Sequence, residues 1–124
     1  MFPSFNELDT QTILQDYQIP TGYSEIGQNL AHALIEQGNV NILDVRTKEE
    51  FDDGHIDGAL NCSHDIIYTY KLLPFNLDKD KPLLIYCRSG HRATEIGPLL
   101  HNMGYKYVLN FGGVLTWKYG LINQ

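Results

Sequence analysis

YCRSGHRA, at residues 86–93, is the stretch around which the rest of this chain is organised. It follows a short apolar run at 82–86, which has the pattern of a buried strand, and it leads into residues 93–96, which have the pattern of a helix start. Cys87 is therefore predicted to lie at a strand-to-helix turn. Consecutive backbone N–H groups at such a turn can surround the sulfur, and the basic side chains add positive potential. We expect this turn to favour a thiolate and to attract anions.

The composition is that of one acidic globular domain. The 124 residues are 43% hydrophobic and 19% charged, which is enough to bury a core. Nine basic residues stand against 15 acidic ones, and the formal charge of −6 argues against a nucleic-acid partner. The basic residues beside Cys87 therefore predict a local anion pocket in an acidic protein.

Cysteine usage and the N-terminal sequence bear on the compartment. Cys62 and Cys87 are too few for a disulfide framework and have no C-x-x-C spacing, so a reducing compartment fits them. Glu7 and Asp9 stand where a signal peptide would carry basic residues, and no apolar run approaches the roughly 18 residues that span a bilayer. We expect a cytoplasmic protein with no membrane partner.

Short strands alternate with helical patterns along the chain. Residues 1–15 form either a short helix packed on the domain or a loose arm, and the domain itself is expected to span 16–124. Strands are expected at 17–19, 40–45, 59–62, 82–86 and 105–109. Helices are expected from an N-cap at Ser24 to Gly38, from Thr47 through 51, over 64–72, over 92–103, and through Trp117 after a turn at 111–113. This alternation predicts an α/β sandwich with a mainly parallel sheet.

The strand at 40–45 ends in polar residues. Asp44 and Arg46 emerge at its carboxyl end, where α/β proteins place functional groups. Thr47 and Glu50 then match a capping box, in which each side chain satisfies a backbone donor of the other residue. This segment is the second candidate for functional side chains.

A catalytic cysteine needs its thiolate stabilised, because an ordinary thiol with a pKa of about 8.5 is mostly protonated at neutral pH. Helix N-terminal N–H groups and the guanidinium groups of Arg88 and Arg92 can both do this for Cys87. The alternative is a structural cysteine that ends a strand, and Cys62, with no basic neighbour before His64, fits that alternative. The five histidines show neither an i, i+4 pair nor nearby paired cysteines, so we expect no metal site.

Four ordered segments resemble the signatures of the rhodanese (thiosulfate sulfurtransferase) family. The first is D-V-R-x-x-x-E-F-x-x-G-H-I-x-G-A at residues 44–59, and the second is the stretch at 86–93. The third is Gly104-Tyr105 with Val108, and the fourth is G-G-x-x-x-W at residues 112–117. The resemblance covers about residues 20–120, which is nearly the whole chain.

The resemblance implies a rhodanese-like three-layer sandwich, with a five-stranded, mainly parallel sheet and helices on both faces. It also implies a cysteine that carries a persulfide between two half-reactions. The donor would be a small sulfur anion such as thiosulfate, or another persulfide, and the acceptor would be cyanide or a thiol, including a thiol of a protein. The scheme requires no metal or organic cofactor, and the oligomeric state stays open.

Residue by residue, the resemblance makes Cys87 the nucleophile. The substrate-binding residues would be those of the following loop, Arg88, Ser89, Gly90, His91 and Arg92, whose backbone forms a cradle. Arg88 and Arg92 are expected to contact an anionic donor, and Asp44 and Arg46 are expected to support the loop. Glu50 is expected to pair with Arg46 at i, i+4, while His55 and Trp117 serve the scaffold.

Two other classes of function are compatible with a reactive cysteine. Phosphatases and arsenate reductases of the related cell-cycle type use C-x5-R, but the sixth residue after Cys87 is Ala93 and the arginine is Arg92. The shorter loop favours sulfur over a phosphate group. A non-catalytic or sulfur-relay protein-interaction module is the other alternative. Retention of the cysteine and both arginines argues against a non-catalytic module, whereas a sulfur relay would use the same residues as the enzyme.

Overall fold

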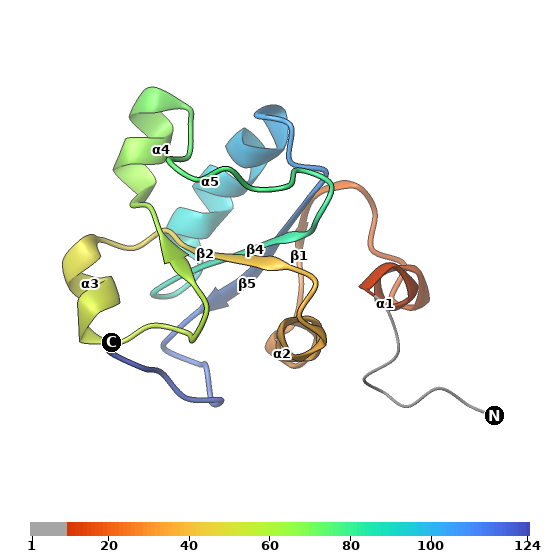
Figure 1. Cartoon of the computed structure of the whole chain (residues 1–124), viewed down its shortest axis with the longest axis horizontal. Helices are drawn as coiled ribbons and strands as arrows, with labels where there is room; N and C mark the ends of the chain where they lie inside the picture. The colour runs from red at the N-terminus through yellow and green to blue at the C-terminus, as the bar shows by residue number, and fades with distance from the viewer. Residues whose placement is uncertain (1–9) are drawn as a thin grey trace.

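A five-stranded parallel sheet runs through the middle of the molecule in the computed structural model, which describes residues 10–124 (Figure 1). The strand order is β1-β5-β4-β2-β3, and every adjacent pair is parallel. The strands are β1 (Gly22–Glu25), β2 (Asn41–Asp44), β3 (Leu60–Asn61), β4 (Leu83–Cys87) and β5 (Tyr107–Gly113). The strand that ends in Cys87 is therefore the central one.

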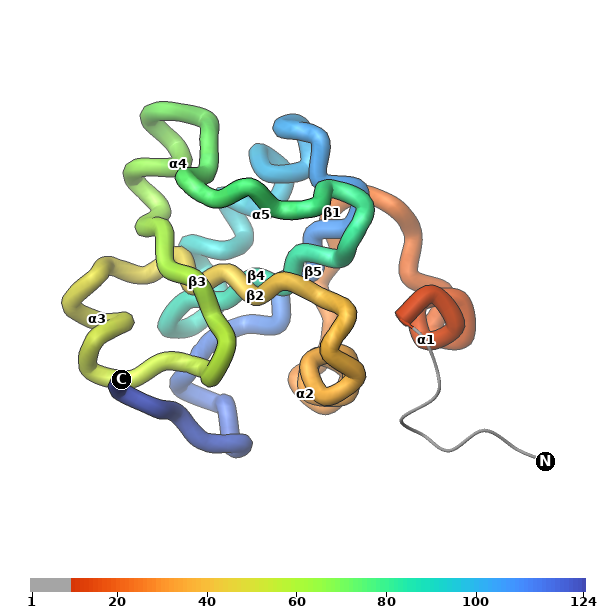
Figure 2. Tube along the Cα trace, viewed as in Figure 1, coloured from red at the N-terminus to blue at the C-terminus, as the bar shows by residue number. Residues whose placement is uncertain are grey.

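Helices cover both faces of this sheet, so the molecule has three layers (Figure 1). One face carries α1 (Thr10–Asp16) and α2 (Gln28–Gln37), and the other carries α4 (His64–Tyr70) and α5 (His91–Asn102). The short helix α3 (Lys48–Asp53) lies near the C-terminus of the chain, as Figure 2 shows. This arrangement confirms the predicted rhodanese-like sandwich. None of the helices in residues 10–124 combines the length and the apolar character needed to cross a bilayer.

The residues of β4 explain why a continuous apolar run precedes the cysteine. Leu83, Ile85 and Cys87 pack in the core beneath α4 and α5, whereas Leu84 and Tyr86 pack in the core beneath α1 and α2. All five side chains are at most 1% exposed. A strand buried on both faces has no polar alternation, which is the pattern expected at the centre of a parallel sheet.

The N-terminal part of the prediction needs two corrections. Residues 17–19 are not a strand; they close α1, where the Ile19 N–H donates to the Leu14 carbonyl at 2.8 Å. Ser24 lies inside β1 and caps nothing, and α2 begins after Gly27. The reason is non-local, because β1 exists by pairing with β5. Of the predicted arm, residues 1–9 lie outside the described residues, and the helix α1 that follows buries Ile13 and Leu14 in the core.

The C-terminal part needs one correction. Residues 111–113 are not a turn, because β5 continues to Gly113, and no helix follows it within the described residues. The chain instead turns beneath the residues after Cys87, where the Val114 N–H donates to the Cys87 carbonyl at 3.1 Å. Tertiary pairing with β4 therefore replaces the helix that the local pattern suggested.

Candidate active site

Cys87 ends β4 and is 1% exposed. The Gly90 N–H donates to the Cys87 sulfur at 3.0 Å. Gly90 has a left-handed φ of +107° and is the N-cap of α5, so the chain turns tightly between strand and helix. A backbone donor and the positive end of a 12-residue helix therefore both favour negative charge on this sulfur.

The two glycines that end β5 support this loop from below. A Cβ on Gly113 would overlap the Arg88 carbonyl group and lie 2.6 Å from the Ser89 nitrogen. A Cβ on Gly90 would lie 3.1 Å from the Gly112 Cα, so the loop and the end of β5 are in close contact. The local sequence predicts a turn at these glycines and does not indicate this contact with the loop. Their adjacency was the available signal, because close approach of two backbones is a common reason for glycine.

Asn110 holds the same loop through its side chain, and sequence analysis also missed it. Its Nδ2 donates to the Tyr23 hydroxyl at 3.0 Å and lies 3.4 Å from the Gly90 carbonyl oxygen. Its Oδ1 accepts from the Gly112 N–H at 2.9 Å. The Thr94 hydroxyl donates to the same Gly90 carbonyl at 2.9 Å. An asparagine inside the apolar strand β5 was the signal, since a buried amide needs specific partners.

The side chains of the loop differ in exposure. Arg88, Ser89 and His91 are exposed, Gly90 is buried, and Arg92 lies between these extremes. The His91 Nε2 lies 3.3 Å from a carboxylate oxygen of Glu95, one turn along α5. The predicted residues 87–92 therefore run from the end of β4 through a tight turn into the first residues of α5, with the basic side chains of Arg88 and His91 open to solvent.

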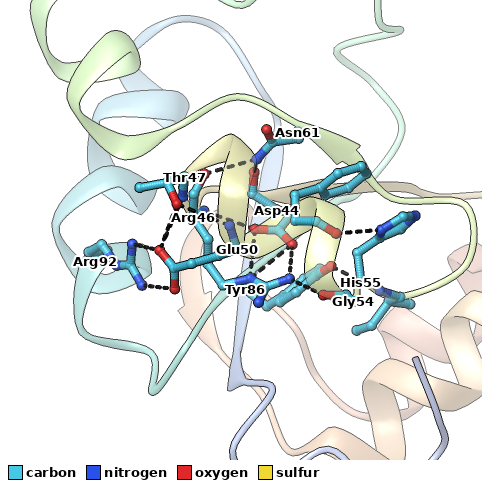
Figure 3. Close-up of polar contacts among 11 residues, drawn as sticks. Asp44, Arg46, Thr47, Glu50, Gly54, His55, Asn61, Tyr86 and Arg92 are labelled. Atoms are coloured by element: carbon cyan, nitrogen blue, oxygen red, sulfur yellow. Dashed lines mark hydrogen bonds and ion pairs between the residues drawn. The ribbon is translucent and has the colours of Figure 1, made fainter. Parts of the chain in front are cut away.

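Arg92 pairs with Glu50 on α3, as Figure 3 shows. Its Nη1 donates to Oε1 at 2.8 Å and its Nη2 donates to Oε2 at 3.0 Å. The Arg92 guanidinium lowers the pKa of Glu50 to about 2. Glu50 in turn raises the pKa of Arg92, and Cys87 adds a smaller contribution in the same direction. The predicted Glu50–Arg46 pair is therefore wrong.

Arg46 has a different partner, which explains that error. Its Nη2 lies 2.7 Å from Asp44 Oδ2 and also donates to the Gly54 carbonyl at 2.6 Å (Figure 3). The Asn61 amide donates to the carbonyl groups of both Asp44 and Arg46, at 3.1 and 2.9 Å. Both charged side chains are buried. Arg46 thus connects Asp44, at the end of β2, with Gly54, which follows α3.

Tyr86 lies on the face of β4 that packs beneath α1 and α2, and its hydroxyl connects this strand to the segment after α3. Its hydroxyl accepts from the Ile56 N–H at 3.0 Å. Burial, followed by the nearby Asp44 carboxylate, raises the pKa of Tyr86, so the phenol stays neutral. The residue before the cysteine is thereby tied to the segment that follows α3.

A pocket of about 430 Å³ lies beside the loop, at the carboxyl ends of β1 and β5. Ser89, Gly90 and His91 form its wall on the loop side, and Gln28 and Asn110 contribute amide groups. Cys87 does not line it. The loop backbone therefore separates this pocket from the sulfur.

The second cysteine cannot reach the first. Cys62 is 5% exposed, and burial, followed by the charge of Asp65, raises the pKa of its thiol. Asp44 pairs with Asn61 on one side and with Tyr86 on the other, so Val45 lies between the two cysteines in the sheet. The two cysteines are therefore two strands apart, at about 4.8 Å for each spacing. This separation exceeds the Cα–Cα distance of roughly 7 Å beyond which a disulfide cannot form. Within residues 10–124, no three His, Cys, Asp or Glu side chains are grouped to hold a metal ion.

The fold and the loop define an α/β protein in which a cysteine ends the central strand of a parallel sheet and its sulfur accepts a backbone N–H in a strand-to-helix turn. This chain belongs to the rhodanese-like domain family, whose model matches residues 28–119. It is 32% identical over 97 residues to a protein of Coxiella burnetii named thiosulfate sulfurtransferase GlpE, covering 77% of this chain and 88% of that one. It is 33% identical over 96 residues to a sulfurtransferase of Allochromatium vinosum, covering 76% and 87%.

A solved structure agrees with the fold. The rhodanese-like domain protein of Staphylococcus aureus superposes with a TM-score of 0.67 at 31% identity, covering 82% of this chain and 98% of that one. Together, the family match and this superposition confirm the resemblance that the four sequence segments indicate.

Proposed function

We propose that this chain is a sulfurtransferase in which Cys87 carries sulfane sulfur as a persulfide. The observation that supports this most directly is the Gly90 N–H, which donates to the Cys87 sulfur at 3.0 Å in a turn that opens α5. The relatives named sulfurtransferase and thiosulfate sulfurtransferase support the same general activity. The donor and acceptor below are part of the proposal.

In the first half-reaction, the Cys87 thiolate attacks the outer sulfur of thiosulfate. The S–S bond of thiosulfate breaks, its electron pair leaves with sulfite, and Cys87 becomes a persulfide anion. The negative charge moves by one atom and stays near the loop, whose Gly90 N–H donates to the Cys87 sulfur. A persulfide donor would react in the same way, with a thiolate as the leaving group.

In the second half-reaction, the terminal sulfur passes to an acceptor. The carbon of cyanide, or a thiolate, attacks that sulfur, and the electron pair of the S–S bond returns to Cys87 as a thiolate. Thiocyanate, or a persulfide of the acceptor, is the product. The sequence needs no electrons from outside and no metal or organic cofactor.

The loop supplies the donor site in this proposal. Gly90 holds the sulfur through its N–H, while Arg88, Ser89 and His91 are exposed where a donor would approach. Arg92 adds positive charge from the first turn of α5. Asp44 and Arg46 support the loop indirectly, through the segment that contains α3. Because both cysteines are free, we propose a reducing compartment such as the cytoplasm.

A protein acceptor is a second candidate, and Leu115 favours it. This side chain is 61% exposed, and its backbone N–H donates to the Arg88 carbonyl at 3.1 Å, so an apolar group stands in solvent directly beside the loop. Single exposed apolar side chains are common on protein surfaces, so it is the position of Leu115 beside the loop that favours a protein acceptor. A protein partner with an accessible thiol would then receive the sulfur.

The structure offers no support for the phosphatase alternative. Ala93, which occupies the position of the phosphatase arginine, lies in the first turn of α5 with its side chain fully buried in the core. An arginine side chain from that position would have no route to an anion at the loop.

The test is sulfur transfer by purified protein with thiosulfate and cyanide. We expect thiocyanate to form with wild-type protein and to be lost in Cys87→Ala, because only Cys87 has the backbone donor. Cys62→Ala is the matched control, since this buried thiol lies outside the loop, and it should keep most of the activity. Absence of thiocyanate with wild type, or full activity in Cys87→Ala, would contradict the proposal.

A further inference from the structure

The Glu50–Arg92 ion pair is the feature of the site that the proposed chemistry does not yet use. It joins α3 to the first turn of α5, across 42 residues of sequence. Both oxygens of the carboxylate face both terminal nitrogens of the guanidinium, at 2.8 and 3.0 Å. The two side chains are only 29% and 27% exposed. Bidentate geometry and partial burial make this a strong and well-oriented pair.

Glu50 is itself fixed from the opposite side. Its Oε1 accepts from the Thr47 N–H at 3.2 Å, and its own N–H donates to the Thr47 hydroxyl at 3.2 Å. The start of α3 is thus a closed capping box, and the Asp44–Arg46 pair holds the adjoining chain to the sheet. A continuous series of contacts therefore runs from β2 through Glu50 to Arg92 and the loop (Figure 3).

We propose that Glu50 is a positioning residue for sulfur transfer, and that Arg92 is its fixed partner instead of a ligand of the donor. Glu50 holds Arg92, and with it the C-terminal end of the loop that surrounds Cys87. Arg92 then stabilises the negative charge of the persulfide electrostatically, with its guanidinium held in one position by Glu50. This inference rests on the proposed function and assigns Arg92 a role different from the donor contact that the sequence predicted.

Glu50→Gln separates the two roles, because one predicts a lower KM for thiosulfate and the other predicts a lower kcat with every donor. If Arg92 binds the donor, removing its competitor frees the guanidinium, and KM for thiosulfate falls. If Glu50 positions the loop, the loop loosens, and kcat falls for every donor. Glutamine can still accept from the Thr47 N–H, so the cap of α3 is kept while the ion pair is lost.

The kinetic experiment compares thiosulfate with an uncharged organic polysulfide. We expect Glu50→Gln and Arg92→Gln each to lower kcat by about tenfold with both donors, since a small misplacement of reacting groups costs this much or more. The double variant should be no slower than the slower single variant, because the two side chains act as one unit. A lower KM for thiosulfate in Glu50→Gln, or multiplicative losses in the double variant, would overturn the inference.

The matched control is Asp52→Asn. It makes the same carboxylate-to-amide change on α3, but Asp52 pairs with Lys48 on the same helix, at 2.6 Å, and not with the loop. We expect kcat and KM to stay at the wild-type values. Similar losses in Asp52→Asn and Glu50→Gln would show a general effect of charge and overturn the positioning role.

A second measurement does not depend on substrate. Amide hydrogen exchange of a peptide covering residues 86–95 should be faster in Glu50→Gln than in wild type, and unchanged in Asp52→Asn. Equal exchange in wild type and Glu50→Gln would overturn the inference. Failure of wild-type protein to transfer sulfur would instead contradict the proposed function, so the two failures are distinguishable.

Discussion

Gly113 supports the loop because it has no side chain. The Arg88 carbonyl group occupies the space that a Cβ would need, and the Ser89 nitrogen lies 2.6 Å from that position. The Val114 and Leu115 N–H groups then donate to the Cys87 and Arg88 carbonyl groups. The Gly90 N–H, which donates to the Cys87 sulfur, therefore depends on Gly113 for its position.

Gly113→Ala should displace the loop. We expect the free energy of unfolding to fall by about 1–3 kcal/mol, because the obstructing atoms are backbone and cannot move aside like a flexible side chain. Sulfur transfer should fall with it. Gly27→Ala is the control, since Gly27 has a φ of −71° and nothing within 4 Å of its Cβ position. Urea unfolding at pH 7 measures the stability of both variants, and the thiocyanate assay measures their activity. If Gly113→Ala kept the stability and activity of wild type, this account would be contradicted.

Individual side chains at the site were predicted unevenly. Local spacing was enough for Cys87 and Gly90, because the strand, the turn and the helix start are contiguous in sequence. It was not enough for the contacts of Asn110, or for Arg92 as the partner of Glu50, 42 residues away. Those partners are chosen by tertiary packing, and a helical i, i+4 spacing only makes a contact possible.

At the scale of elements, α3 is the link between the sheet and the loop. Its capping box was predictable, because Thr47 and Glu50 are three residues apart. The first strand and the end of β5 were not predictable in the same way. Both are defined by partners more than 20 residues distant, Tyr107 to Asn110 for β1 and Cys87 for Gly113. Local propensity has no information about such pairing.

The stability that the Glu50–Arg92 pair contributes should decrease as the pH falls. The folded-state pKa of Glu50 is about 2, below its ordinary value of 4.5, because the Arg92 guanidinium favours the carboxylate. Its contribution to stability is therefore complete above about pH 5 and is lost as the pH falls toward 2. Glu50→Gln should be less stable than wild type at pH 7, by about 1–2 kcal/mol after allowing for solvent screening.

Urea unfolding of wild type and Glu50→Gln at several pH values measures this effect. The difference in free energy between the two proteins should shrink steadily between pH 5 and pH 2. Asp52→Asn, which removes an exposed ion pair on the same helix, should unfold at nearly the wild-type urea concentration at pH 7, because solvent screens such a pair. A constant difference between wild type and Glu50→Gln across this range would show that the ion pair contributes nothing.

For the whole molecule, the topology brings the functional segments together. The loop after β4, the end of β5 and the segment after β2 meet because parallel strands have their carboxyl ends at one edge. The alternation of strands and helices was enough to predict an α/β sandwich with a mainly parallel sheet, whereas the five strands and the three layers were implied by the family resemblance. The pocket of about 430 Å³ behind the loop was not foreseen, because its wall combines β1, β5 and the loop.

The central claim is that Cys87 becomes a persulfide, and intact mass tests it most directly. After incubation with thiosulfate and removal of excess donor, wild-type protein should be heavier by about 32 Da, the mass of one sulfur atom, which the attack of the thiolate adds. Peptide mapping should place the added sulfur on Cys87, and reductant or cyanide should remove it. An unchanged mass in wild type, or the same gain in Cys87→Ala, would contradict the account.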